Sequence, residues 1–153
     1  MSADARRQAA EAFWRDENAA NEQAEATATI AKRLNFRTKS VVVLPAARKT
    51  QYLIDLPVVP DSIAARLLVS HHIAHKRAMM ASFLDALGVA HDNCMIDGEP
   101  VIPREADKIH TVVKAIAASF PAEDVALYLS TLIWQDPETW ETLARFPETQ
   151  LPT

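Results

Sequence analysis

Apolar and polar positions alternate with a helical period over most of the chain. Between Asp61 and Gly88 the sequence contains no glycine or proline, and its apolar side chains fall nearly all round a helical wheel. A helix that is apolar on most sides is usually surrounded by other helices. The sequence therefore predicts a long central helix over about 61–87, with Gly88 as its C-terminal stop.

Further helices are predicted around this central one. An N-terminal helix over about 3–34 carries a narrow stripe rich in alanine, and the pattern is compatible with a break near Asp16. Several prolines suit the first turn of a helix, because the N–H that proline lacks would have no partner there. The helices expected from these prolines span about 45–56, 103–119, 121–134 and 137–146.

Three segments have less regular patterns. Residues 35–44 suit a connector or a single helical turn, because their β-branched valines have no obvious partner strand. Asp97-Gly98 is a turn dipeptide, so the sequence allows a minimal β-hairpin near 94–102, although Pro100 weakens its second arm. Residues 147–153 are expected to form a loose tail. Together the patterns predict an all-α fold, a single domain over 1–153 with five to six helices bundled around the central one.

Composition removes several classes of function. Gly88 and Gly98 are the only glycines, so the chain lacks the glycine-rich loops that hold phosphates in nucleotide-binding folds. Cys94 is the only cysteine, which excludes an internal disulfide and a multi-cysteine metal site and fits a reducing compartment. No segment approaches the ~20 apolar residues that span a bilayer, and the first residues lack the apolar core of a signal peptide. We therefore expect a cytoplasmic protein with no membrane partner.

The net charge of −4 is unevenly distributed along the chain. Residues 32–80 carry nine basic and two acidic side chains, whereas residues 81–153 carry four basic and twelve acidic ones. The basic side chains cluster at Lys32, Arg33, Arg37, Lys39, Arg48 and Lys49. With Phe36 among them, this basic patch resembles a surface that contacts phosphates. Because the rest of the chain is acidic and no recognition helix is evident, nucleic-acid binding is the weaker interpretation, and a solvated face or a counter-charge to the acidic part is preferred.

Three of the five histidines fall close together in the predicted central helix. His71 and His75 are one turn apart on the same face, beside small side chains that include Ser82, so they could share a metal ion or line a ligand site. No glutamate occurs in 61–87, so further ligands would come from elsewhere: His91, Asp92, Asp97, Asp107 or His110. The preferred interpretation is structural, with His71 and His75 half-buried and hydrogen-bonded. His72 is expected at the surface or in a partner contact.

The sequence therefore favours a non-enzymatic interaction or regulatory domain of a bacterial, cytoplasmic type. We expect it to form a homodimer through its alanine-rich N-terminal helix, and we expect no cofactor. The main alternative is a helical bundle that binds a divalent metal or a small molecule through His71 and His75. A catalytic Cys94 activated by His91 is disfavoured, since the three-residue spacing is the only evidence for it.

Overall fold

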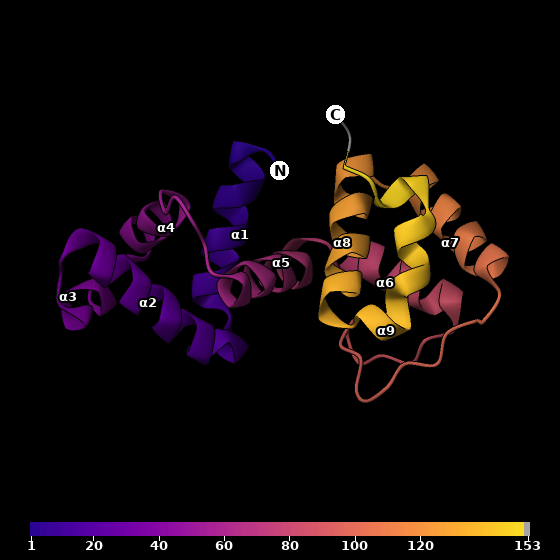
Figure 1. Ribbon diagram of the computed structural model, residues 1–153, viewed down its shortest axis with the longest axis horizontal. Helices are drawn as coiled ribbons and strands as arrows, with labels where there is room; N and C mark the ends of the chain where they lie inside the picture. Colours follow the sequence, from indigo (N-terminus) through magenta and orange to yellow (C-terminus); the bar gives the residue numbers. More distant parts are fainter. Residues whose placement is uncertain (152–153) are drawn as a thin grey trace. The chain divides into compact units, whose positions relative to one another are not determined.

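The computed structural model describes residues 1–151 and confirms the all-α prediction. This range contains nine α-helices and three short 3₁₀ helices, and no strand is present in it (Figure 1). Contacts within the chain gather into two compact units, residues 1–71 and 72–153. The prediction of a single domain is not decided by this division and stays a prediction.

The N-terminal unit contains four helices and the first part of a fifth. They are α1 (Ala3–Arg15), α2 (Ala20–Leu34), α3 (Thr38–Val42), α4 (Ala46–Ile54) and α5 (Asp61–His75). Ser2 caps α1, because its hydroxyl accepts a hydrogen bond from the Ala5 N–H at 3.1 Å. The expected break near Asp16 is present, since a 3₁₀ turn, Glu17–Ala19, separates α1 from α2.

The core of this unit combines a few large side chains with many alanines. Phe13, Ile30, Leu53 and Ile63 are almost completely buried, and they come from α1, α2, α4 and α5. Six alanines of α1, α2 and the turn between them are also buried: Ala9, Ala10, Ala12, Ala19, Ala26 and Ala31. Small side chains allow helix axes to approach closely, so the buried alanines serve packing inside the unit, whereas Ala20 and Ala24 are exposed.

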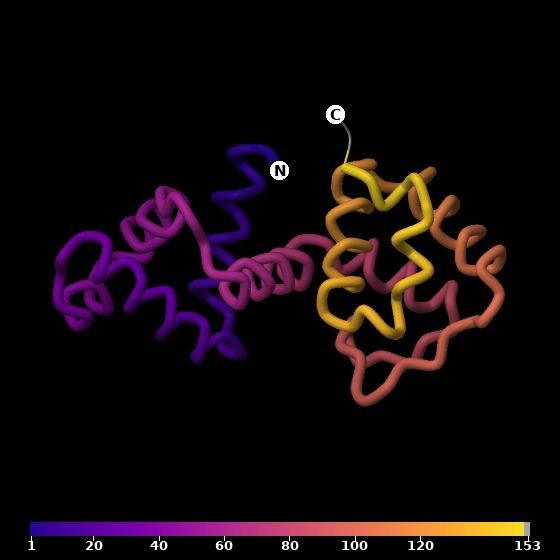
Figure 2. Tube along the Cα trace, viewed as in Figure 1, coloured from indigo at the N-terminus to yellow at the C-terminus, as the bar shows by residue number. Residues whose placement is uncertain are grey.

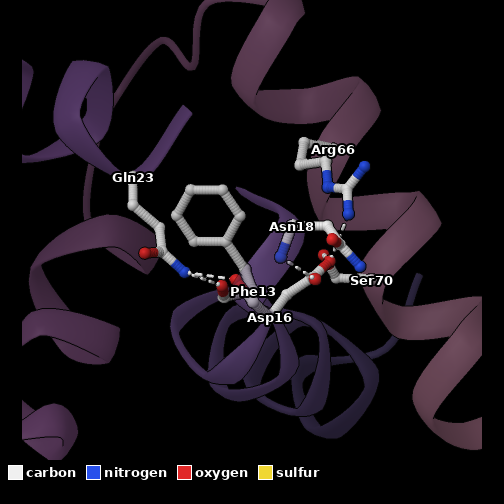
Figure 3. A network of polar contacts seen from close by, with 6 residues as sticks. All are labelled: Phe13, Asp16, Asn18, Gln23, Arg66 and Ser70. Atoms are coloured by element: carbon white, nitrogen blue, oxygen red, sulfur yellow. Dashed lines mark hydrogen bonds and ion pairs between the residues drawn. The ribbon is translucent and has the colours of Figure 1, made fainter. Parts of the chain in front are cut away.

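Asp16 lies at the junction between α1 and α2 and binds groups from α5 (Figure 3). Its carboxylate accepts hydrogen bonds from Arg66 Nη2 at 2.6 Å and Ser70 Oγ at 2.7 Å, and from the Asn18 N–H at 2.9 Å. The amide of Gln23 donates to the carbonyls of Phe13 and Asp16 at 2.7 and 2.9 Å. The same carbonyls accept backbone hydrogen bonds from the Asp16 N–H at 3.3 Å and the Ala19 N–H at 3.1 Å, so Gln23 adds a second donor to each at the end of α1.

The C-terminal unit is built from three long helices and a shorter helical segment. They are α6 (Arg77–Leu87), α7 (Ala106–Ser119), α8 (Ala122–Gln135), α9 (Pro137–Trp140), and the 3₁₀ turns Glu141–Arg145 and Pro147–Thr149. Phe83 is fully buried, with its ring 5.6 Å from that of Tyr128 and 6.0 Å from that of Trp140. Thr149 is also buried and donates to the Leu143 carbonyl at 2.6 Å. The expected loose tail is therefore packed through Thr149, and residues 152–153 lie outside the described range.

The predicted continuous helix over about 61–87 is wrong, because the chain is interrupted at Lys76. Lys76 has φ −127°, so α5 ends at His75 and α6 begins at Arg77. In a continuous helix the backbone N–H of Arg77 would donate to the Ile73 carbonyl. Here the Nε of the Arg77 side chain donates to that carbonyl instead, at 2.7 Å. Most of α5 is also half-buried or exposed, so it is not a spine buried on all sides.

The hairpin expected near 94–102 is also wrong for the residues described. Gly88 ends α6 with φ +74°, and an irregular connection then leads to α7 (Figure 2). Within it the tight turn lies at Asn93-Cys94, where Asp92 and Met95 exchange backbone hydrogen bonds of 2.8 and 2.9 Å. Both turn residues have positive φ, as a type I′ turn requires, but within residues 1–151 no strands extend the bridge.

Candidate functional site

The basic patch arises from a long segment without acidic residues. Residues 26–54 contain six basic side chains and neither aspartate nor glutamate. Asn35 ends α2 in the left-handed conformation with φ 55°, and the chain then turns into the short helix α3. Lys32 and Arg33 lie in the last turn of α2, where a positive charge is favoured by the helix dipole.

The structure divides the predicted patch into two groups. Arg48 lies over the Tyr52 ring at 5.9 Å and donates to its hydroxyl at 3.3 Å. The ammonium of Lys49 lies 4.9 Å from the centre of the Trp14 ring, which joins α4 to α1. These contacts assign Arg48 and Lys49 a packing role within the unit.

The other group lies at the end of α2 and in α3, beside exposed apolar side chains. Lys32, Arg33, Arg37 and Lys39 are exposed, and in residues 1–151 no carboxylate lies within ion-pair distance of them. Exposed apolar side chains occur in the same short segment: Phe36 (48% exposed), Val42 (56%) and Val43 (79%). We call residues 32–43 the basic surface. Exposed apolar side chains with charged neighbours are typical of surfaces that bind another molecule.

A small pocket lies beside the basic surface, between α2 and α4. Its volume is about 230 Å³, and it is lined by Ile30, Arg33, Leu34, Tyr52, Asp55 and Leu56. Pockets that enclose drug-sized ligands have volumes of roughly 300–1,000 Å³. The pocket is smaller than these, and its lining carries one charge of each sign, Arg33 and Asp55.

The residues of the predicted histidine site differ in their exposure. His71 and His75 lie one turn apart on α5, but His71 is buried and His75 is exposed. Ser82 is exposed on α6, beyond the interruption at Lys76. His72 is buried rather than at the surface, with its ring 5.5 Å from that of Tyr128.

The other histidines proposed as further ligands are held by carboxylates. His91 Nε2 lies 2.7 Å from Asp85, and His110 Nε2 lies 3.0 Å from Glu148 while its ring stacks on Phe146 at 4.3 Å. Among residues 1–151, no group of three or more histidine, cysteine, aspartate or glutamate side chains could hold a metal ion.

Cys94 is not arranged as a nucleophile. His91 Nδ1 accepts a hydrogen bond from the backbone N–H of Cys94 at 3.0 Å, so it does not bind the thiol there. The thiol instead faces the Arg77 carbonyl at 3.4 Å. Burial raises the pKa of Cys94, which reduces the thiolate fraction that nucleophilic attack requires.

Comparison of the chain with protein-family models, curated protein sequences and solved structures found no match. In the part of the chain that the structure describes, no helix is long and apolar enough to cross a bilayer. The site must therefore be interpreted from its own chemistry. Sequence reasoning identified the cationic side chains and Phe36, but it missed Val42 and Val43. The feature of the sequence that marks this region is the absence of aspartate and glutamate from residues 26–54.

Proposed function

We propose that this chain is a non-enzymatic interaction domain that binds an acidic, partly apolar protein surface through residues 32–43. One observation carries the proposal. Four exposed cations and three exposed apolar side chains lie within a segment that has no acidic residue. A cytoplasmic location is part of the same proposal and rests on the single cysteine.

The apolar side chains favour a protein partner over a nucleic acid. Phosphate contacts require cations, and single-stranded bases stack on aromatic rings. Val42 and Val43 supply neither cations nor rings, yet they are 56% and 79% exposed. A partner with carboxylates and apolar side chains would use both components of the surface.

The test is a titration of the ¹⁵N-labelled full chain, followed by NMR, with two synthetic peptides of equal length and charge. One peptide combines glutamate with leucine, and the other combines glutamate with serine. We expect the shifts caused by the first peptide to concentrate in residues 32–43. The serine peptide should bind at least about tenfold more weakly, because it lacks the apolar contacts.

Two charge-reversed variants make the experiment specific. In the double variant Arg37→Glu/Lys39→Glu, affinity for the leucine peptide should fall by at least about tenfold. The control, Arg6→Glu/Arg15→Glu, makes the same change of charge at exposed positions of α1 and should bind normally. The proposal is contradicted if the shifts lie elsewhere, or if duplex DNA or phosphatidylserine vesicles bind more tightly than the leucine peptide.

A further inference from the structure

We propose that the partner of the basic surface is the loop between α6 and α7 of a second copy of this chain. The inference rests on the proposed function and names its partner. It differs from the dimer expected through the alanine-rich N-terminal helix, where Ala10, Ala26 and Ala31 are already buried inside the N-terminal unit.

The loop has the chemistry that the basic surface requires. Residues 91–103 contain Asp92, Asp97 and Glu99, and they contain neither lysine nor arginine. All three carboxylates are exposed. Met95 and Val101 are exposed in the same loop, by 47% and 85%. We call residues 91–103 the acidic loop.

The local backbone explains why these side chains are presented to solvent. The turn at Asn93-Cys94 is fixed by the two backbone hydrogen bonds between Asp92 and Met95, and within the turn Cys94 is buried. His91 ties the start of the loop to Asp85 at 2.7 Å. Ile96 and Ile102 also pack against the core, while Asp97, Glu99 and Val101 between them are exposed.

The two surfaces match in charge and in kind. Residues 1–71 carry ten basic and eight acidic side chains, whereas residues 72–153 carry six basic and twelve acidic ones. Each surface places apolar side chains among charges of one sign, so contact would bury both apolar sets and pair opposite charges. Because each copy carries both surfaces, two copies can satisfy both at once in a closed, symmetric dimer.

The first measurement is the mass of the full chain by light scattering as a function of protein and salt concentration. We expect a concentration-dependent dimer that weakens as salt increases, because exposed charge pairs are screened. Arg37→Glu/Lys39→Glu and, separately, Asp92→Lys/Glu99→Lys should each weaken the dimer by at least about tenfold. The control Arg6→Glu/Arg15→Glu should dimerise like the wild type.

Exchange of charge gives the sharper test. In a mixture of the two variants, the reversed surface of one copy faces the reversed loop of the other, so a heterodimer should form. The quadruple variant that carries both reversals should dimerise again by itself. These rescues separate a contact between the two surfaces from simple loss of folding.

The apolar component has its own matched pair of variants. Val43→Ser should weaken the dimer about threefold or more without changing its salt dependence, because it removes apolar area only. Val58→Ser changes a valine of similar exposure, 77% against 79%, outside both surfaces and should leave the dimer unchanged.

A wild-type chain that stays monomeric at every concentration overturns the inference, as does a dimer that both charge reversals leave intact. If the chain is monomeric while the leucine peptide still shifts residues 32–43, the proposed function stands and only the identity of the partner is wrong. If neither the peptide nor a second copy binds there, both proposals fail.

Discussion

Replacement of Asp16 by asparagine tests how the N-terminal unit is held together. The carboxylate of Asp16 accepts a hydrogen bond of 2.6 Å from Arg66 and one of 2.7 Å from Ser70, both on α5. A hydrogen bond to a charged group contributes about 1.5–3 kcal/mol. The Arg66 and Asp16 side chains retain 17% and 14% exposure, so solvent screens the pair only partly. We expect Asp16→Asn to lower the free energy of unfolding of this unit by about 2 kcal/mol.

The pH dependence gives a second, independent readout. Burial alone would raise the pKa of Asp16, but the hydrogen bonds from Ser70, the Asn18 N–H and Arg66, together with the Arg66 charge, lower it. In the unfolded chain an aspartate has a pKa of about 3.9, so the Asp16 carboxylate binds a proton more readily in the unfolded chain than in the folded one. The stability that Asp16 contributes is therefore present above about pH 4 and is lost as the pH falls through the folded pKa.

The assay is urea unfolding followed by ¹H–¹⁵N NMR peak intensities, which report residues 1–71 and 72–153 separately. The difference between the wild type and Asp16→Asn should appear in residues 1–71 and should shrink as the pH falls below about 4. Asp4→Asn is the control, because its pair with Arg7 is 60–80% exposed and contributes at most about 0.5 kcal/mol. Equal urea midpoints for Asp16→Asn and Asp4→Asn would refute this account of the network.

Two further predictions concern the C-terminal unit. Burial raises the pKa of Cys94, so the folded chain should carry less of the reactive thiolate than the unfolded chain. At about pH 8 we expect iodoacetamide to modify the folded chain at least about tenfold more slowly than the urea-unfolded chain, as followed by mass spectrometry. Equal rates would show that the thiol is not protected by burial. Gly88→Ala should lower the free energy of unfolding of residues 72–153 in urea by about 1–2 kcal/mol, because Gly88 has φ +74°. An added Cβ would meet no atom within 4 Å, so the whole effect would come from backbone strain. An unchanged midpoint would contradict that assignment.

Proline and glycine positions explain why much of the fold could be predicted. The helices expected at about 45–56 and 121–134 are observed as Ala46–Ile54 and Ala122–Gln135, each directly after a proline. Gly88 ends α6 as expected. These residues restrict the local backbone whatever surrounds them, so their effect can be read from the sequence alone.

The break at Lys76 could not be predicted in this way. Its neighbours include neither glycine nor proline, so nothing local stops the helix. Tertiary contacts accompany the break: Lys76 pairs with Asp124 of α8 at 2.9 Å, and Arg77 binds the carbonyl that the interruption leaves free. Such contacts join residues far apart in the sequence, and periodicity within one helix cannot reveal them.

The candidate site was predictable in its charges but not in its apolar part. Three consecutive valines, 41–43, suggest a buried strand by content, yet only Val41 points into the core at 0% exposure. One short helical turn directs successive side chains about 100° apart, so it cannot bury all three. The exposed pair follows from the helical geometry of α3, which composition does not specify.

We propose an interaction domain rather than an enzyme, and the contacts of the ionisable groups support that proposal. Asp16 is bound by Arg66 and Ser70, while His91 and His110 each pair with a carboxylate. Catalysis needs such groups to face a reactant, whereas each of these is bound to a group of its own chain. Two exposed segments carry charges of one sign each, positive in residues 32–43 and negative in residues 91–103. Segments of opposite charge attract one another selectively, and this is the physical reason for the recognition that we propose.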